Sequence, residues 1–504
     1  MGVLRSIGLL LLAWIAAPPA CYGADDPDQK SQPPTAFAGP EPKPVLQWGL
    51  GEARSTLVPA LEIPAFELLL NRFDHAFEDA ATYSSPLDNL HDNLHRKWVV
   101  DSDKFSTNQF LHPYQGSIYQ GLARSSGLDF WEASAYTFAG SLLWETSGES
   151  TEPSINDQIA SGIGGNFLGE SLFRIASLML ESGSGDTPGF WRELGAAIIS
   201  PGLGFNRLAY GERFAPVFRS NDPAVFTRVD LAATVGSHYT SNINVNVDPS
   251  APPARQNYQR AADSATFTIG YGLPGKPDYT YTRPFDYFNF EFTADSVNTI
   301  DALFSRGLLV GRSYEGGDSY RGIWGLYGIY DYVAPNIFRV SNTAGAVGTT
   351  GQWWISKKIA LQGTALAGVG YAGGGVIRGN GVTAAGVGGD GLRNYHYGIT
   401  PESVVALRLI FGERADLDAT ARGYYISEYA ATESTGSETL DSVDVALTVR
   451  VYKLHGLTIR YSQSSRDGRY AHEPSSHQNV WTATIGYTLL GHARFGAVDW
   501  RNGS

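Results

Sequence analysis

Residues 441–461, DSVDVALTVRVYKLHGLTIRY, carry the clearest structural pattern of the chain. Apolar and mainly polar side chains alternate through residues 443–451, and the alternation resumes at residues 457–461 after an interruption at Lys453–Gly456. Successive side chains of a β-strand point to opposite faces, so alternation gives a strand one apolar and one polar face. The stretch therefore predicts two antiparallel strands joined by a short turn.

The same period of two recurs on both sides of this hairpin. It is clearest in the segments Val229–Val235, Phe288–Phe292 and Trp481–Leu489. Counted in this way, the chain carries about twelve strands between roughly residues 226 and 490. An even number of antiparallel strands would place both ends of a barrel on the same side, which is the periplasmic side in an outer membrane.

Alternation alone does not say which face points inward, because a soluble sandwich hides its apolar face whereas a membrane barrel presents that face to lipid. The strand segments are about nine to thirteen residues long, near the length that crosses a bilayer at a tilt. Their polar faces carry charged side chains, which suit a wet or salt-bridged lumen. These are Asp230, Glu291, Arg408, Asp416, Asp418, Arg422, Asp444, Arg450 and Arg460.

The connections between strands also favour a membrane barrel. Gly412–Arg414 and Lys453–Gly456 are short, whereas Ala430–Leu440 and Ser465–Gln478 are long. Short turns on one side and long loops on the other are typical of outer-membrane barrels. We expect further external loops at residues 242–263 and 373–391. One feature departs from the pattern, since such barrels resemble one another in ending on an aromatic residue and this chain runs on past Trp500.

Composition agrees with this interpretation and excludes other classes of protein. Charged residues make up 17% of the 504 residues, below the roughly 25% of an ordinary soluble domain. The formal net charge of -13 argues against a nucleic-acid partner. The single cysteine excludes an intramolecular disulfide framework and a Cys-based zinc cage.

The amino terminus predicts export from the cytoplasm. Residues 1–24 place Arg5 before a short apolar run that ends in small residues, which is the layout of a secretory signal peptide. We expect ordinary cleavage near Ala24. Lipidation of Cys21 is the alternative, although two prolines precede it. Residues 25–59 follow as a Pro-rich linker, and no later stretch has the roughly 18 consecutive apolar residues of a spanning helix.

Residues 60–212 have helical rather than strand periodicity. The fold class is therefore α+β and multidomain, with a periplasmic α-helical domain at residues 60–212 and an outer-membrane barrel at residues 213–504. We expect the helical domain to dock under the barrel or to plug it. The predicted helices are Leu61–Ala80, Ser106–Ser125, Asp129–Trp144, Ser154–Glu181 and Trp191–Ile199, with Pro201 stopping the last one.

Small residues at helical spacing predict close contact between two of these helices. Gly165 and Gly169 are four residues apart on the fourth helix, and Ala135 and Ala139 have the same spacing on the third. Such spacing lets helix backbones approach closely. We interpret it as tight packing of a helix pair, with membrane dimerisation as the alternative.

Four short motifs follow one another in the helical domain. They are H-P-Y-x-G-S at residues 112–117, W-E-x-x-x-E at 144–149, P-S-x-x-D at 153–157 and G-x-x-x-G-E at 165–170. In this order they resemble a bacterial family known as domain of unknown function 3943, over about residues 100–210. The resemblance implies an envelope setting and supplies no catalytic residue.

The polar residues of these motifs are the candidate site. The catalytic candidates are His112, Glu145, Glu149 and Glu170, and the binding candidates are Tyr114, Ser117, Asp157, Asn166 and Arg207. Glu145 and Glu149 would share a helix face if the third helix ran through Gly148. Three alternatives stay open: acid/base chemistry on a lipid or glycan, a divalent metal held by imidazole and carboxylates, or structural ion pairs with Arg124, Arg174 and Arg207. No metal ligand set is assigned, and any cofactor is unidentified.

The sequence predicts an outer-membrane location more clearly than it predicts any one activity. We expect a porin-like transport role or a role in envelope maintenance in a Gram-negative bacterium. The alternative is an outer-membrane hydrolase that acts on lipid or cell-wall material through His112 and Glu145. The expected partners are outer-membrane lipid and a periplasmic protein.

Overall fold

The computed structural model describes eleven ranges of the chain. They are residues 54–101, 103–182, 188–211, 217–241, 255–296, 300–334, 338–376, 395–428, 436–470, 475–492 and 494–501. The predicted signal peptide, Cys21 and nearly all of the predicted linker lie outside the described residues.

Within these ranges, twelve strands form one closed antiparallel barrel in chain order, and the last strand pairs with the first. The expected strand count is confirmed. The strands are β1 (Val225–Ser241), β2 (Arg255–Tyr271), β3 (Phe288–Asp295), β4 (Ala302–Gly316), β5 (Tyr320–Val333), β6 (Phe338–Trp354), β7 (Ile359–Val376), β8 (Tyr395–Phe411), β9 (Ala415–Glu428), β10 (Gly436–Tyr452), β11 (His455–Tyr470) and β12 (Ser476–Leu490).

The apolar faces of the strands point outward. On β10, Val443, Leu447 and Val449 are exposed, whereas Asp444 lines a cavity inside the barrel together with Arg460 of β11. A closed barrel satisfies all of its backbone hydrogen bonds internally, and an apolar exterior suits lipid. The chain is therefore an antiparallel outer-membrane β-barrel preceded by helices, and the expected fold class is confirmed.

The two ends of the barrel differ. At the end where β1 begins and β12 ends, which we call the turn end, most connections are short: 317–319, 355–358, 412–414 and 453–454, with 272–287 as the long exception. At the opposite end, the loop end, the connections are 242–254, 296–301, 334–337, 377–394, 429–435 and 471–475. Several strands are longer than expected, since β2 begins at Arg255 and β11 extends to Tyr470. The predicted loop residues 377–391 lie outside the described residues.

Helices precede the barrel, and none of those in the described ranges is both long and apolar enough to cross a membrane on its own. Their bounds are α2 (Leu57–Phe77), α3 (Pro86–Asn93), the π-helical turn η1 (Thr107–Leu111) continued by α4 (His112–Ser125), α5 (Phe130–Leu143) continued by η2 (Trp144–Gly148), α6 (Ile155–Ile159), η3 (Ala160–Gly164) and α7 (Gly165–Glu181), then α8 (Phe190–Ile199) and α9 (Pro201–Tyr210).

Two local predictions about the helices were wrong. The helix predicted at Trp191–Ile199 does end before Pro201, but it is not the last one. Pro201 opens a further helix, α9, as its first residue, where its missing N–H costs nothing and its fixed φ suits a helix. The close helix contact involves Gly165 and Gly116 of α4, not Ala135 and Ala139, which are exposed. We call the helices from α2 to α9 the bundle.

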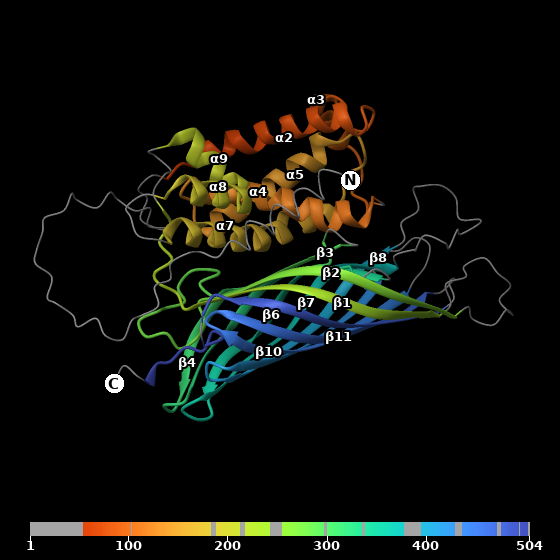
Figure 1. Ribbon diagram of the computed structural model, residues 1–504. Coiled ribbons are helices and arrows are strands. Elements are labelled where there is room, and N and C mark those ends of the chain that lie inside the picture. Colours follow the sequence, from red (N-terminus) through yellow and green to blue (C-terminus); the bar gives the residue numbers. More distant parts are fainter. Residues whose placement is uncertain are drawn as a thin grey trace, which may run out of the picture.

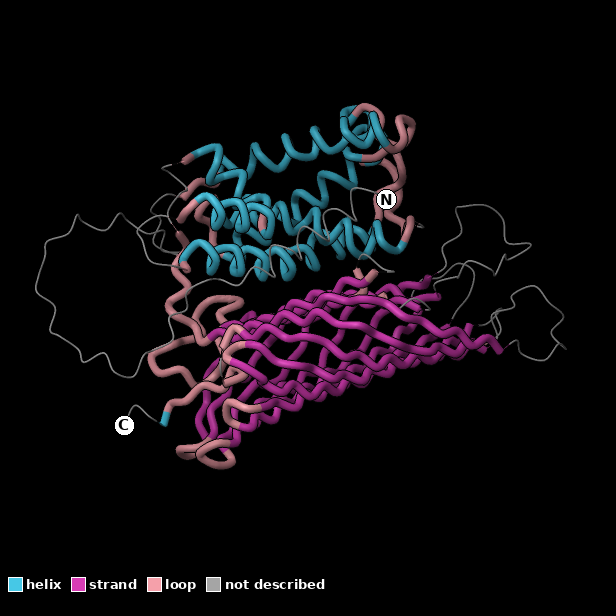
Figure 2. Tube along the Cα trace, in the orientation of Figure 1, coloured by secondary structure: helices cyan, strands magenta, loops and turns pink. Residues whose placement is uncertain are grey.

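The bundle lies against the outer wall of the barrel, as Figures 1 and 2 show. Helix α7 runs lengthwise along the wall and contacts β4 and β5, and α2 is farthest from it. The cavity in the lumen is lined only by residues from Arg228 to Gly486. The expectation that the helical domain plugs the barrel or docks under it was therefore wrong. The outward face of the strands is apolar enough to pack against helices as well as lipid.

The contact between bundle and wall is mainly aromatic. Phe130 of α5 stacks on Phe285, with ring centroids 5.7 Å apart, and Phe167 of α7 stacks on the same ring at 6.3 Å. The buried cluster that includes these rings also holds wall residues of β2, β3, β5 and β8: Phe267, Phe288, Phe290, Phe292, Tyr330, Tyr332, Tyr395 and Tyr397. The core of the bundle is thus completed by the barrel.

Candidate functional site

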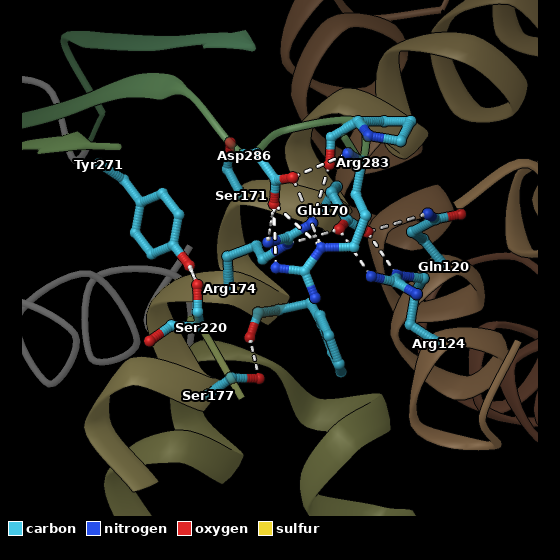
Figure 3. A network of polar contacts seen from close by, with 12 residues as sticks. Gln120, Arg124, Glu170, Ser171, Arg174, Ser177, Ser220, Tyr271, Arg283 and Asp286 are labelled. Carbon is cyan, nitrogen blue, oxygen red and sulfur yellow. Dashed lines mark hydrogen bonds and ion pairs between the residues drawn. The ribbon is translucent and has the colours of Figure 1, made fainter. Parts of the chain in front are cut away.

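Polar side chains are buried in two clusters where the bundle meets the barrel. The first cluster is centred on Glu170 of α7 (Figure 3), and it lies at the turn end, where the β2–β3 connection supplies Asp286. Glu170 accepts hydrogen bonds from Nε and Nη2 of Arg124 at 2.6 and 2.9 Å, and from Nε of Arg174 at 2.9 Å. Nη1 of Arg174 in turn donates to Asp286, at 3.1 Å, in the β2–β3 connection.

The two arginines and two carboxylates of this cluster balance one another, and Arg283, which also pairs with Asp286 at 3.0 Å, is partly exposed. Arg124, Arg174 and Glu170 are at most 2% exposed, so each would be costly without its partners. Burial alone would raise the pKa of Glu170, but Arg124 and Arg174 hold it below its ordinary value. A carboxylate with a lowered pKa that already accepts three hydrogen bonds is poorly suited to proton transfer. This geometry is the one expected if Glu170 forms structural ion pairs with arginines.

The second cluster lies at the loop end and contains His112. Nε2 of His112 is 3.9 Å from a carboxylate oxygen of Asp157. Nδ2 of Asn156 donates to Asp157 at 2.9 Å and to Asp101 at 3.2 Å. The barrel closes the cluster, because Asn156 also donates to the hydroxyl of Tyr397 on β8, at 3.1 Å.

Burial shifts the pKa of both titratable partners in the second cluster away from its ordinary value. Burial, followed by the charges of Asp101 and Glu145, raises the pKa of Asp157 well above its usual range. Burial lowers the pKa of His112 to about 4, against an opposing effect of Asp101. Among the described residues, Nδ1 of His112 has no hydrogen-bond partner. The imidazole of His112 and the carboxyl group of Asp157, 3.9 Å apart, are the kinds of group that general acid–base chemistry uses.

Glu145 and Glu149 do not share a helix face. The helical backbone ends at Gly148, and Glu149 has extended angles of φ -129° and ψ 153°. Glu145 accepts the backbone N–H of Ser154 at 2.8 Å, whereas Glu149 accepts the indole N–H of Trp144 at 3.1 Å. Burial raises the pKa of both, that of Glu149 to about 7.

The remaining candidates do not converge on these clusters. Ser117 donates to the carbonyl of Tyr114 at 2.6 Å, and Asn166 donates to the carbonyl of Gly162 at 2.7 Å. Arg207 pairs with Glu193 on α8. In the described ranges, no group of three His, Cys, Asp or Glu residues is placed to hold a metal ion.

The barrel lumen is a third polar region. Arg228 contacts Asp418 at 2.7 Å and Asp230 at 3.2 Å, and Arg408 contacts Asp418 at 2.6 Å. Beside these ion pairs lies a cavity of about 340 Å³, lined also by Glu291, Asp444 and Arg460. Cations and anions alternate around it, so neither sign of charge dominates.

The segment after β12 closes the lumen at the turn end. The carbonyl of Val498 accepts hydrogen bonds from Gln352 at 2.6 Å and from Trp354 at 3.0 Å, and Gln362 donates to the carbonyl of Gly496 at 2.8 Å. Phe495 and Trp500 are buried with lumen residues of the same end. We call residues 494–501 the closing segment. Its course explains why the chain continues beyond the last strand.

Comparison with known families identifies one part of the chain. Residues 97–202 match the family model DUF3943, a domain of unknown function. This confirms the resemblance expected from the four motifs. No curated protein matches the chain.

Solved structures similar to the chain are membrane barrels. They include the NanC porin (10% identity, 51% of this chain and 99% of that chain, TM-score 0.25), the outer membrane protease OmpT from Escherichia coli (8%, 53% and 96%, TM-score 0.22) and a FadL homologue from Pseudomonas aeruginosa (12%, 54% and 93%, TM-score 0.23). TM-scores this low carry no argument about function, and the barrel assignment rests on the pairing of the chain's own strands.

The DUF3943 region contributes to both buried clusters, but the barrel completes each of them. Asp101, Asn108 and Asn156 lie within the region and were missed as members of the His112 cluster. Tyr395 and Tyr397 close this cluster, and they stand 287 and 241 positions after their partners Asn108 and Asn156. No pattern within the DUF3943 region could have indicated partners that belong to a barrel strand.

Proposed function

We propose that the barrel is a channel for small polar solutes and that the closing segment gates it. The observation that carries this proposal is a polar cavity of about 340 Å³ behind a segment that closes the turn end of the lumen. This volume is within the range of about 300–1,000 Å³ of small-molecule sites. The alternation of Arg and Asp around the cavity favours polar solutes of low net charge.

The closing segment is attached in a way that suits a gate. Its backbone is hydrogen-bonded to the side chains of Gln352, Trp354 and Gln362 rather than to a strand edge, and the rings of Phe495 and Trp500 are buried beside it. A neutral hydrogen bond of this kind stabilises by only about 1 kcal/mol. Because β1 begins and β12 ends at the turn end, this mouth would face the periplasm.

The test is single-channel conductance of the purified protein in planar bilayers. We expect the wild type to open rarely and a Gln352→Ala/Gln362→Ala variant to open about tenfold more often, since about 1.4 kcal/mol corresponds to a factor of ten. The matched control is Gln463→Ala, an exposed position on β11. Heat-modifiable gel mobility verifies that each barrel is assembled. If the assembled double variant opens as rarely as the wild type, the proposal of a gated channel is wrong.

A second candidate function is a hydrolase that acts on outer-membrane lipid through the His112 cluster. The observation that favours it is the neutral imidazole of His112 beside Asp157. His112→Gln keeps a side chain of similar polarity but removes the titratable group. Mass spectrometry of envelope lipids should then show loss of a product in cells that carry this variant. If lipid profiles of assembled wild type, His112→Gln and a strain without the protein are identical, the hydrolase is excluded.

A further inference from the structure

Helix α2 has an inverted polarity. The side that faces the rest of the bundle buries the polar residues Glu62, Glu67 and Asn71 beside Pro59 and Ile63, whereas its outer side exposes apolar residues. These exposed residues are Leu57, Leu61, Leu68, Leu69, Phe73 and Phe77. A helix on the surface of a water-soluble domain normally has the opposite arrangement.

Helix α5 repeats the pattern. Its buried side holds Thr137, Gly140 and Ser141 besides Phe130 and Ala133, and its outer side exposes Trp131, Phe138 and Leu142. Ile163 of η3 is also exposed, next to Phe138, since Phe138 packs against Gly162. Monomeric soluble proteins rarely expose continuous apolar areas of this extent. We call the exposed apolar residues of α2, α5 and η3 the outer face.

The bundle extends along the barrel wall from the turn end to the loop end. At the turn end, Arg174 contacts Asp286, which lies in the β2–β3 connection two residues before β3 begins. At the loop end, Asn108 contacts Tyr395, the first residue of β8. Between these ends, Ser171 contacts Ser305 of β4. Contacts at both ends mean that a membrane around the barrel must also surround the bundle.

We infer that the outer face contacts the acyl chains of the bilayer in which the barrel sits. Helix α2 has 21 residues, which at about 1.5 Å per residue span about 31 Å, close to the roughly 30 Å hydrocarbon thickness of a bilayer. The barrel holds the bundle at this depth, so no helix has to insert alone. The surface is continuous with the lipid-facing wall of the strands that the bundle leaves uncovered.

The charges of the bundle fit this setting. Arg124, Arg174 and Glu170 are paired at the buried contact with the wall. The exposed charged residue Arg72 lies in the last two turns of α2, from which a long side chain reaches the headgroups. Polar groups that are costly in lipid thus lie inside the bundle or toward its ends.

The test uses nitroxide labels on the full protein in bilayers, in a Cys21→Ser background. Labels at Leu69→Cys and Phe138→Cys report on the outer face. Ile485→Cys, which is exposed on the barrel wall, is the lipid reference, and Asp88→Cys on α3 is the matched aqueous reference. We expect both outer-face labels to match Ile485, with at least about threefold higher collision rates with oxygen than with a water-soluble nickel chelate, because oxygen concentrates in hydrocarbon.

Each other result would overturn the inference. If either outer-face label matches Asp88, that face is in water. If collisions with both oxygen and the chelate are suppressed, another protein or a second copy of the chain covers the face. Heat-modifiable mobility of each labelled protein verifies that the barrel is assembled, and conductance is not part of the readout, so this test is independent of the proposed channel.

Discussion

At the scale of single residues, we expect the loss of the Glu170 carboxylate to reduce the stability of the bundle most. Glu170→Gln would leave Arg124 and Arg174 with Asp286 as the remaining anion of the cluster. Removing one partner of a buried ion pair costs about 3–5 kcal/mol. We expect a loss of this size in the free energy of unfolding of the bundle, measured by urea titration of the reconstituted protein.

The matched control for this prediction is Glu132→Gln. Glu132 pairs with Arg54, but both side chains are partly exposed, so we expect a change below about 1 kcal/mol. A glutamine also retains the capping interaction at the start of α5. Equal effects of the two substitutions would contradict the structural role of Glu170.

Residue patterns predicted part of the ion-pair cluster around Glu170 but not all of it. Of the ion pairs expected between Arg124, Arg174 or Arg207 and the acidic candidates, those of Arg124 and Arg174 with Glu170 form, whereas Arg207 pairs with Glu193. Asp286 could not be predicted, because a partner in the β2–β3 connection depends on how the helices pack against the barrel. The placement of Glu149 was also beyond local periodicity, since the helix ends one residue earlier.

At the scale of elements, the packing of α4 against α7 depends on missing side chains. A Cβ atom on Gly165 would lie 2.6 Å from the Cα atom of Gly116, a distance at which the backbone of one helix would have to move. We expect Gly165→Ala to destabilise the bundle by about 1–3 kcal/mol, despite the higher helix propensity of alanine. Thermal unfolding followed by circular dichroism measures the effect.

Gly189→Ala is the control at this scale. Gly189 precedes α8, and an added Cβ atom would meet nothing within 4 Å. Its φ of -78° is ordinary for alanine. An unchanged unfolding temperature for Gly189→Ala with a clear loss for Gly165→Ala would support the close contact, and two unchanged temperatures would refute it.

Strands were easier to predict than helix ends. Alternation fixed the strand count and the outward face of β10 and β11, because both follow directly from a period of two. Pro201 was misinterpreted because a proline is equally compatible with the end of one helix and the first turn of the next. Tertiary packing of α8 against α9, not local preference, decides between them.

At the scale of the whole molecule, the barrel should assemble without the bundle. In a protein that lacks residues 60–212, the wall residues Phe288, Phe290 and Phe292 would meet lipid instead of helices. Because lipid accepts apolar side chains as readily as a helix does, we expect a heat-modifiable band in the outer-membrane fraction. A truncated protein that is degraded or stays in the periplasm would show that the bundle is required for assembly.

The position of the bundle could not have been predicted from the sequence for the same reason. Phe288, Phe290 and Phe292 alternate with polar residues as they would if lipid covered them. Only the three-dimensional structure distinguishes the part of the wall that carries helices from the part that does not.

The pairing of β12 with β1 has a consequence for how the barrel assembles after export. Thr488 donates to Asp230, which lies 258 positions earlier in the chain, and closing such a loop carries a large entropic cost that local contacts cannot offset. Strand β1 must therefore wait, with one edge open, until the last strand has been exported. During that interval the unfinished sheet is open to pairing with other chains, so escort by chaperones between the two membranes would be most valuable at this stage.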